Sequence, residues 1–100
     1  MSLDENKVGV IGEWLKEEFE GYTVHDVFDA RRSSQFYRID EGGKLRHRVL
    51  VSGEFIDDHA IQEITRLLDE WKLGAVIKSS GARQVIVTNG GARVETEAKE

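Results

Sequence analysis

The chain has 100 residues, a formal net charge of −5 at pH 7, and neither cysteine nor proline. This length fits one domain, and the absence of cysteine excludes a disulfide framework and every thiolate metal site. The longest apolar runs hold three residues, whereas a membrane span needs about 20, so we expect a cytoplasmic protein with no membrane partner.

An amphipathic helix is predicted from about Leu3 to Glu20. Ser2 and Glu5 have the spacing of a capping box at its start, and Gly21 can take the left-handed conformation that ends a helix. Apolar residues recur along it at steps of three and four, which is typical of one buried helix face: Val8, Ile11, Leu15 and Phe19.

Three strand-like runs follow, over residues 22–29, 35–40 and 45–52. They are rich in β-branched and aromatic residues, which favour extended structure. Residues 41–44, with Gly42 and Gly43 at the centre, suit a tight hairpin because glycine reaches positive φ without steric cost. Residues 30–33 are also short enough for a hairpin. We therefore predict an antiparallel meander.

The second predicted helix begins near Asp57 as its N-cap and ends at Gly74. Ile56 and Ile61 have the spacing of a hydrophobic staple around its start, and apolar residues continue along one face as far as Trp71. Two further strands are predicted, at about 75–78 and 83–88. A tight turn at residues 89–91 then leads into a short edge strand near 93–96.

These elements predict an α+β fold in the order α-β-β-β-α-β-β, with one further strand as an option. The expected arrangement is a two-layer one, in which two helices cover one face of an antiparallel sheet of five or six strands. Residues 1–96 would form a single domain, and residues 97–100 a disordered acidic tail. By topology alone, the first five elements resemble double-stranded-RNA-binding domains, and the longer order resembles type III secretion chaperones.

Each resemblance has a point of departure. The RNA-binding domains open their second helix with lysines, whereas Asp57 and Asp58 occupy that position here. The secretion chaperones end in a further helix, and no such helix is evident in this sequence.

Charge is distributed unevenly along the chain. Residues 1–20 carry a net charge of −4 and residues 54–71 a net charge of −5, whereas residues 21–53 carry +2. Residues 72–94 contain four basic side chains and no acidic one. The predicted helices are thus acidic and the predicted strands basic. If both helices cover the same face, the opposite side of the sheet is biased toward positive charge.

Alternation along the third strand identifies the side chains on that basic side. Leu45, His47, Val49 and Val51 share the face expected to meet the helices, so Arg46 and Arg48 should point outward with Leu50. Arg38 and Lys78 are expected near them, and Arg31 and Arg32 lie at a predicted loop tip where paired guanidinium groups can bind an anion. The alternative interpretation is that all six residues belong to an ordinary solvated surface.

No group of residues has the spacing of a catalytic or metal site. His25, His47 and His59 fall on two strands and a helix start, without the short regular spacing of zinc ligands. Asp57 and Asp58 suit the first turn of a helix. No catalytic residue, metal or cofactor is therefore predicted.

Two functions remain open at this level. The first is a non-enzymatic protein-interaction module that associates with itself through a sheet edge or a helix face, or with another protein. The second is binding of nucleic acid or another polyanion through the basic sheet face and the Arg31-Arg32 loop.

Overall fold

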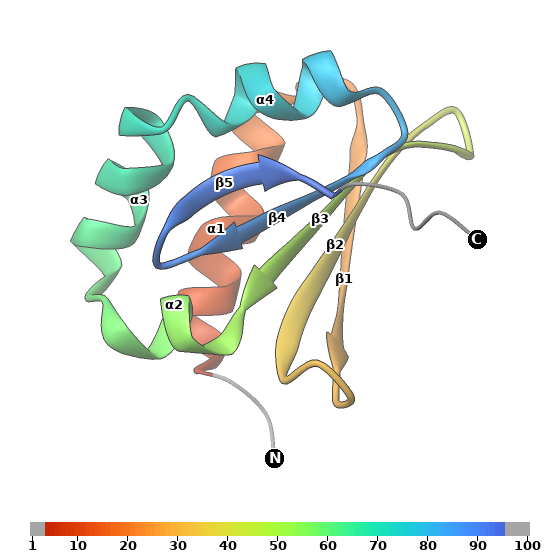
Figure 1. The fold of residues 1–100 in the computed structure, drawn as a ribbon. Coiled ribbons are helices and arrows are strands. Elements are labelled where there is room, and N and C mark those ends of the chain that lie inside the picture. Colours follow the sequence, from red (N-terminus) through yellow and green to blue (C-terminus); the bar gives the residue numbers. More distant parts are fainter. Residues whose placement is uncertain (1–3, 96–100) are drawn as a thin grey trace.

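The computed structural model of the chain describes residues 4–95 and contains four helices and five strands in one mixed sheet (Figure 1). The fold class is α+β, as predicted. In chain order the elements are α1 (Glu5–Glu18), β1 (Thr23–Asp29), β2 (Ser34–Glu41), β3 (Lys44–Ser52), α2 (Gly53–Asp58), α3 (Ile61–Glu70), α4 (Leu73–Ser80), β4 (Gln84–Thr88) and β5 (Gly91–Val94).

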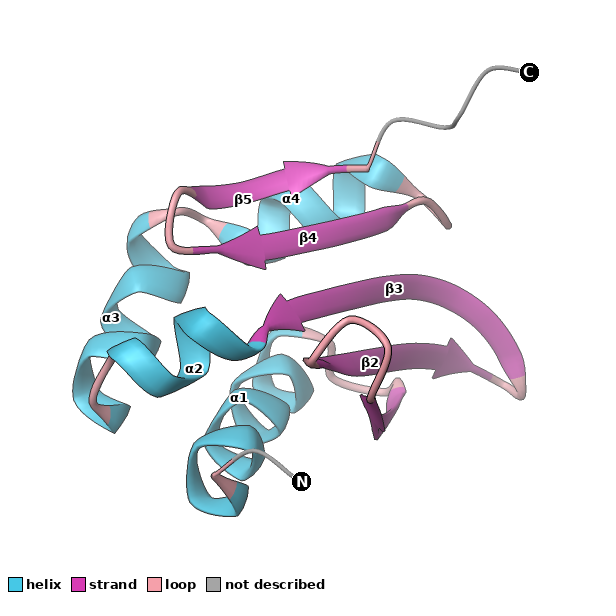
Figure 2. Cartoon of the chain, turned by 60° about the horizontal axis from the view of Figure 1, so that its bottom comes forward, coloured by secondary structure: helices cyan, strands magenta, loops and turns pink. Residues whose placement is uncertain are grey.

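The strands lie in the sheet in the same order as in the chain. β1, β2 and β3 form the predicted antiparallel meander, and β4 and β5 form an antiparallel hairpin. β3 and β4, however, run parallel, so the prediction of a wholly antiparallel sheet is wrong. Parallel neighbours need a long crossover connection, and α2, α3 and α4 supply it, with α2 leaving directly from the end of β3 (Figure 2).

The single helix predicted from Asp57 to Gly74 is replaced by three shorter ones. Ser52 is the N-cap of α2, where its Oγ accepts a hydrogen bond of 3.1 Å from the amide of Phe55, so Asp57 lies inside a helix and does not begin one. Lys72, with a left-handed φ of 54°, separates α3 from α4, and Gly74 lies in the first turn of α4.

The strand predicted at residues 75–78 is also wrong, because this segment belongs to α4. Leu73 and Ile77, four residues apart and both fully buried, define the helix face that enters the core. The short edge strand predicted near 93–96 corresponds to β5, which begins earlier, at Gly91. Residue 96 lies outside the described residues, as does the predicted acidic tail of residues 97–100.

The cap of the first helix differs from the prediction, whereas the β2–β3 hairpin agrees with it. Ser2, the predicted cap of the first helix, lies outside the described residues; Asp4 caps α1, since its Oδ1 accepts a hydrogen bond of 2.9 Å from the amide of Asn6. The hairpin between β2 and β3 forms as predicted, and Gly42 and Gly43 have φ of 59° and 84°, where other residues would be strained.

The core lies between the helices and one side of the sheet. Residues from all four helices, among them Leu15, Phe55, Leu68 and Ile77, form one buried cluster with strand residues of a single alternation set. That set is Tyr37, Ile39, Val49, Val51, Val85 and Val87. None of the helices within residues 4–95 combines the length and apolar character that crossing a membrane requires.

Candidate interaction surface

The strand residues of the opposite alternation set point away from the core, and we call their side of the sheet the outer face. In β2, Tyr37 is fully buried in the core cluster, so its neighbour Phe36 points to the outer face. In β3, Val49 and Val51 are buried in the same cluster and Leu50 points outward. Figure 1 views the outer face, with α1 passing behind the strands.

Four apolar side chains form a continuous row across the outer face. The strand register places Val27 of β1 beside Phe36 of β2, Phe36 beside Leu50 of β3, and Leu50 beside Ile86 of β4. Cross-strand neighbours of this kind have Cβ atoms about 5 Å apart. We call these four residues the apolar row. No residue of the row belongs to the core cluster. Val27 is 59% exposed, Phe36 and Ile86 are partly buried, and Leu50 is buried, at 5% exposure.

Two of the predicted basic residues on this face are paired with acids. The Nε of Arg38 lies 2.7 Å from Oδ1 of Asp40, which also has His25 at 3.8 Å. The Nε of Arg46 lies 3.2 Å from Oε1 of Glu41 at the β2–β3 hairpin. The basic character predicted for the sheet is therefore partly neutralised where it is densest, because each of these arginines has a carboxylate within ion-pair distance.

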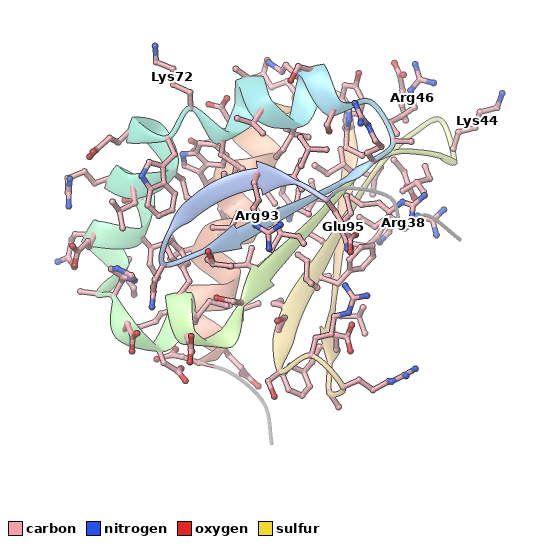
Figure 3. All side chains as sticks on the ribbon, in the orientation of Figure 1. Arg38, Lys44, Arg46, Lys72, Arg93 and Glu95 are labelled. Carbon is pink, nitrogen blue, oxygen red and sulfur yellow. The ribbon has the colours of Figure 1, made fainter. Side chains whose placement is uncertain are left out.

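Arg48 and Arg93 differ from these two. Within residues 4–95 neither of them forms an ion pair. Arg48 lies opposite Arg38 in the register, and Arg93 of β5 lies opposite Ile86, so that it extends the apolar row at its far end. Figure 3 shows Arg93 and Glu95 on the side of the sheet that faces the viewer. Glu95 accepts a hydrogen bond of 2.8 Å from the side-chain amide of Gln84.

The remaining predicted site residues lie elsewhere. Arg31 and Arg32 occupy the β1–β2 turn, where their amides donate to Oδ1 of Asp29 at 3.1 and 3.3 Å. This turn is at the Ser52 end of β3, about 20 Å from Arg46 along the strand. Lys78 is on α4, with its Nζ 5.3 Å from the centre of the Phe19 ring, so it lies on the helical side of the sheet. The six residues therefore do not form one surface.

The three histidines make separate local contacts. His47 lies 5.2 Å from Phe19, ring centre to ring centre, and its Nδ1 is 2.8 Å from the carbonyl of Gly81. His59 Nδ1 is 2.8 Å from the carbonyl of Phe55 at the end of α2. Within the described part of the chain, no three histidine, aspartate or glutamate residues are grouped so that they could hold a metal ion.

Leu45 shows why strand alternation fails at the hairpin end of the sheet. It was expected beside His47 and Val49 on the inner face. The ladder between β2 and β3 shifts register between Ile39 and Asp40, which pairs Leu45 with Asp40, and Leu45 does not pack against the core. A bulge of this kind turns the following residues relative to the regular ladder.

A shallow groove lies on the helical side, between α1 and α3. Its volume is about 480 Å³, and it is lined by Gly9, Val10 and Trp14 with Glu5, Glu13 and Glu17 around them. The indole Nε1 of Trp14 donates to Oδ1 of Asp69 at 2.9 Å, which ties α1 to α3 beside the groove. Three acidic side chains of the first predicted helix, Glu5, Glu13 and Glu17, thus surround this groove.

Three residues of the outer face were missed at the sequence level: Val27, Ile86 and Arg93. The period-two pattern of each strand contains the signal, since each of them alternates with inward-facing neighbours. Sequence alone did not fix which strands are neighbours, so the row could not be assembled.

Comparison with known proteins gives no relative, because no family model, no curated protein and no solved structure matches the chain.

Proposed function

We propose that this chain is a two-layer, non-enzymatic interaction module that associates with a second copy of itself through the outer face. The observation that carries the proposal is the apolar row, which none of the helices within residues 4–95 covers. A row of four large apolar side chains with charged residues on both sides has the composition of a protein interface, an apolar centre within a polar rim.

The charges of the outer face favour a second copy as the occupant. The outer face carries charges of both signs: Arg38 and Arg46 are paired with Asp40 and Glu41, Glu95 follows the strand that holds Arg93, and Lys44 adds a further base at the β2–β3 hairpin. A face that carries both signs can bring opposite charges together when it meets its own copy. It also offers little long-range attraction to a polyanion, because the whole chain carries −5.

The size of the face sets the strength of association. The five strands hold 7, 8, 9, 5 and 4 residues. Each residue covers about 3.3 Å along the strand and about 4.8 Å across it, so the outer face has an area of about 500 Å². Two copies would then bury about 1,000 Å² in total, at the lower end of specific interfaces. We therefore expect a reversible dimer with a dissociation constant in the micromolar range or weaker.

Sedimentation velocity over a range of protein concentrations tests this proposal. The wild-type chain should shift from monomer to dimer as concentration rises. The variant Val27→Lys/Ile86→Lys places two ammonium groups at opposite ends of the apolar row and should weaken the dimer at least about tenfold. Val27 is 59% exposed and Ile86 is partly buried, and neither belongs to the core cluster, so the two replacements remove no contact of that cluster.

Ile61→Lys is the matched control. Ile61 is 37% exposed and lies on α3, away from the outer face, so this variant should dimerise like the wild type. A wild-type chain that stays monomeric at every concentration would overturn the proposal. So would a dimer that Ile61→Lys disrupts and Val27→Lys/Ile86→Lys leaves unchanged.

Binding of single-stranded nucleic acid is a second candidate, and one observation favours it. Phe36 points to the outer face in the same strand as Arg38, which lies opposite Arg48, and a ring beside guanidinium groups suits stacking on a base. If this candidate holds, the fluorescence anisotropy of a labelled oligonucleotide should report binding that weakens steeply with salt and is lost in Arg48→Glu. Unchanged anisotropy in low salt would reject it.

A further inference from the structure

We infer that the second copy packs with its strands nearly parallel to those of the first, so that β5 of one copy lies over β1 of the other and Arg93 pairs with Asp29 of the second copy. This inference rests on the proposed function, because it specifies the orientation of the same dimer. It follows from the positions of charged residues at the ends of the apolar row.

The centre of the outer face identifies where a two-fold axis can pass. β3 is the middle strand of five, and Leu50 is the most buried member of the apolar row, at 5% exposure. An axis that runs along β3 near Leu50 exchanges the two edges of the sheet. Sheets that pack face to face in aligned fashion keep their strand directions within about 30° of each other, which such an axis produces.

This orientation brings opposite charges together at both edges. Arg93 extends the apolar row at its β5 end, so it comes over Val27 of the second copy, and Asp29 is two residues further along β1, about 7 Å away. In the same way, Glu95 comes over His25. Only Oδ1 of Asp29 accepts hydrogen bonds within residues 4–95, so its Oδ2 is free to accept from a guanidinium group.

The alternative axis, perpendicular to the strands, is less favourable. It would place Arg93 of one copy directly over Arg93 of the other, whereas the axis along β3 brings Arg93 near Asp29; each axis sets one arginine against its own counterpart, so the Arg93–Asp29 contact decides between them. The axis along β3 instead brings Arg48 near its own counterpart at the middle of the interface. Because Arg48 has no ion pair within the described residues, Arg48→Ala should tighten the dimer in this orientation.

A charge swap measures the pair directly by sedimentation. Arg93→Glu alone and Asp29→Arg alone should each weaken the dimer about tenfold, because each creates two like-charge contacts per dimer. The double variant Arg93→Glu/Asp29→Arg restores opposite charges and should dimerise like the wild type. If each single variant weakens the dimer and the double variant loses the sum of the two losses in affinity, the proposed orientation is wrong.

Cross-linking gives a second measurement that does not depend on Asp29, which also stabilises the β1–β2 turn. The chain has no cysteine, so Val27→Cys and Arg93→Cys introduced in separate copies can form only disulfides between the new thiols. Mild oxidation of the mixture should give a heterodimer with one Val27→Cys and one Arg93→Cys chain. Ile61→Cys mixed with Arg93→Cys is the control and should not cross-link above background.

The outcomes separate this inference from the proposed function. If Val27→Lys/Ile86→Lys weakens the dimer but the charge swap is not restored and the cross-link is absent, the outer face is the interface and the orientation is wrong. If Val27→Lys/Ile86→Lys leaves the dimer intact, the proposed function itself fails.

Discussion

Replacing Phe55 by alanine is expected to lower the free energy of unfolding by about 3–5 kcal/mol. Phe55 is fully buried in the core, and its ring centre lies 5.6 Å from that of Trp71 and 4.8 Å from that of His59. Its side chain therefore fills the space between α2, the end of α3 and the sheet. Alanine would leave a cavity there that the surrounding helices cannot fully close.

Urea denaturation followed by circular dichroism measures this loss. Phe28→Ala is the matched control, because Phe28 is only partly buried and does not belong to the core cluster. We expect it to cost about 1–2 kcal/mol. Equal losses for the two variants would show that α2 does not anchor the core as the structure indicates.

Alkaline pH is expected to destabilise the chain through Tyr37. The Tyr37 side chain is fully buried, and its hydroxyl donates a hydrogen bond of 2.8 Å to the carbonyl of Val8 in α1. Burial, with a smaller contribution from the negative charge of Asp26, raises the pKa of this hydroxyl well above the ordinary value of 10.0. The folded chain therefore keeps the proton at pH values where the unfolded chain has lost it.

The sign of the effect follows from proton binding. Below pH 10 both states hold the proton, and the stability that Tyr37 contributes is fully present. Above pH 10 the unfolded state binds fewer protons than the folded state, so the free energy of unfolding falls by about 1.4 kcal/mol per pH unit until the folded-state pKa is reached.

Urea midpoints between pH 9 and pH 12 check this expectation. Tyr37→Phe should be less stable than the wild type at pH 9, by about 1 kcal/mol for the lost hydrogen bond, but should show a flatter decline above pH 10. Tyr22→Phe keeps Tyr37 and should follow the wild-type decline. Parallel curves for wild type and Tyr37→Phe would mean that another group causes the alkaline loss.

The sequence predicted well the parts of the fold that depend on local signals. The N-terminal helix, the three-stranded meander and the glycine hairpin all lie close to their predicted positions, because periodicity and turn chemistry are encoded in neighbouring residues. The segment from 53 to 80 was predicted poorly. Its apolar spacing continues across two helix breaks, and the left-handed Lys72 gives no signal of the kind that glycine or proline would give.

The candidate surface was predicted only in part, for a different reason. Arg48 lies in register with Arg38 and is exposed, because alternation within one strand is a local property, whereas Arg46 lies at the bulge where the alternation breaks. Ion pairing of Arg38 and Arg46 depends on the bulge and the hairpin, and the placement of Lys78 depends on a helix that was taken for a strand. The continuity of the apolar row required the strand order, which is a property of the whole fold.

The parallel pairing of β3 with β4 also has a consequence for how the chain folds. The meander and the β4–β5 hairpin each join residues that are close in sequence, whereas the β3–β4 ladder closes a loop over residues 53–83. The entropy lost in closing such a loop must be offset before the ladder contributes, and contacts of this kind slow folding. We therefore expect the central ladder, in the middle of the finished sheet, to be the last part of it to form.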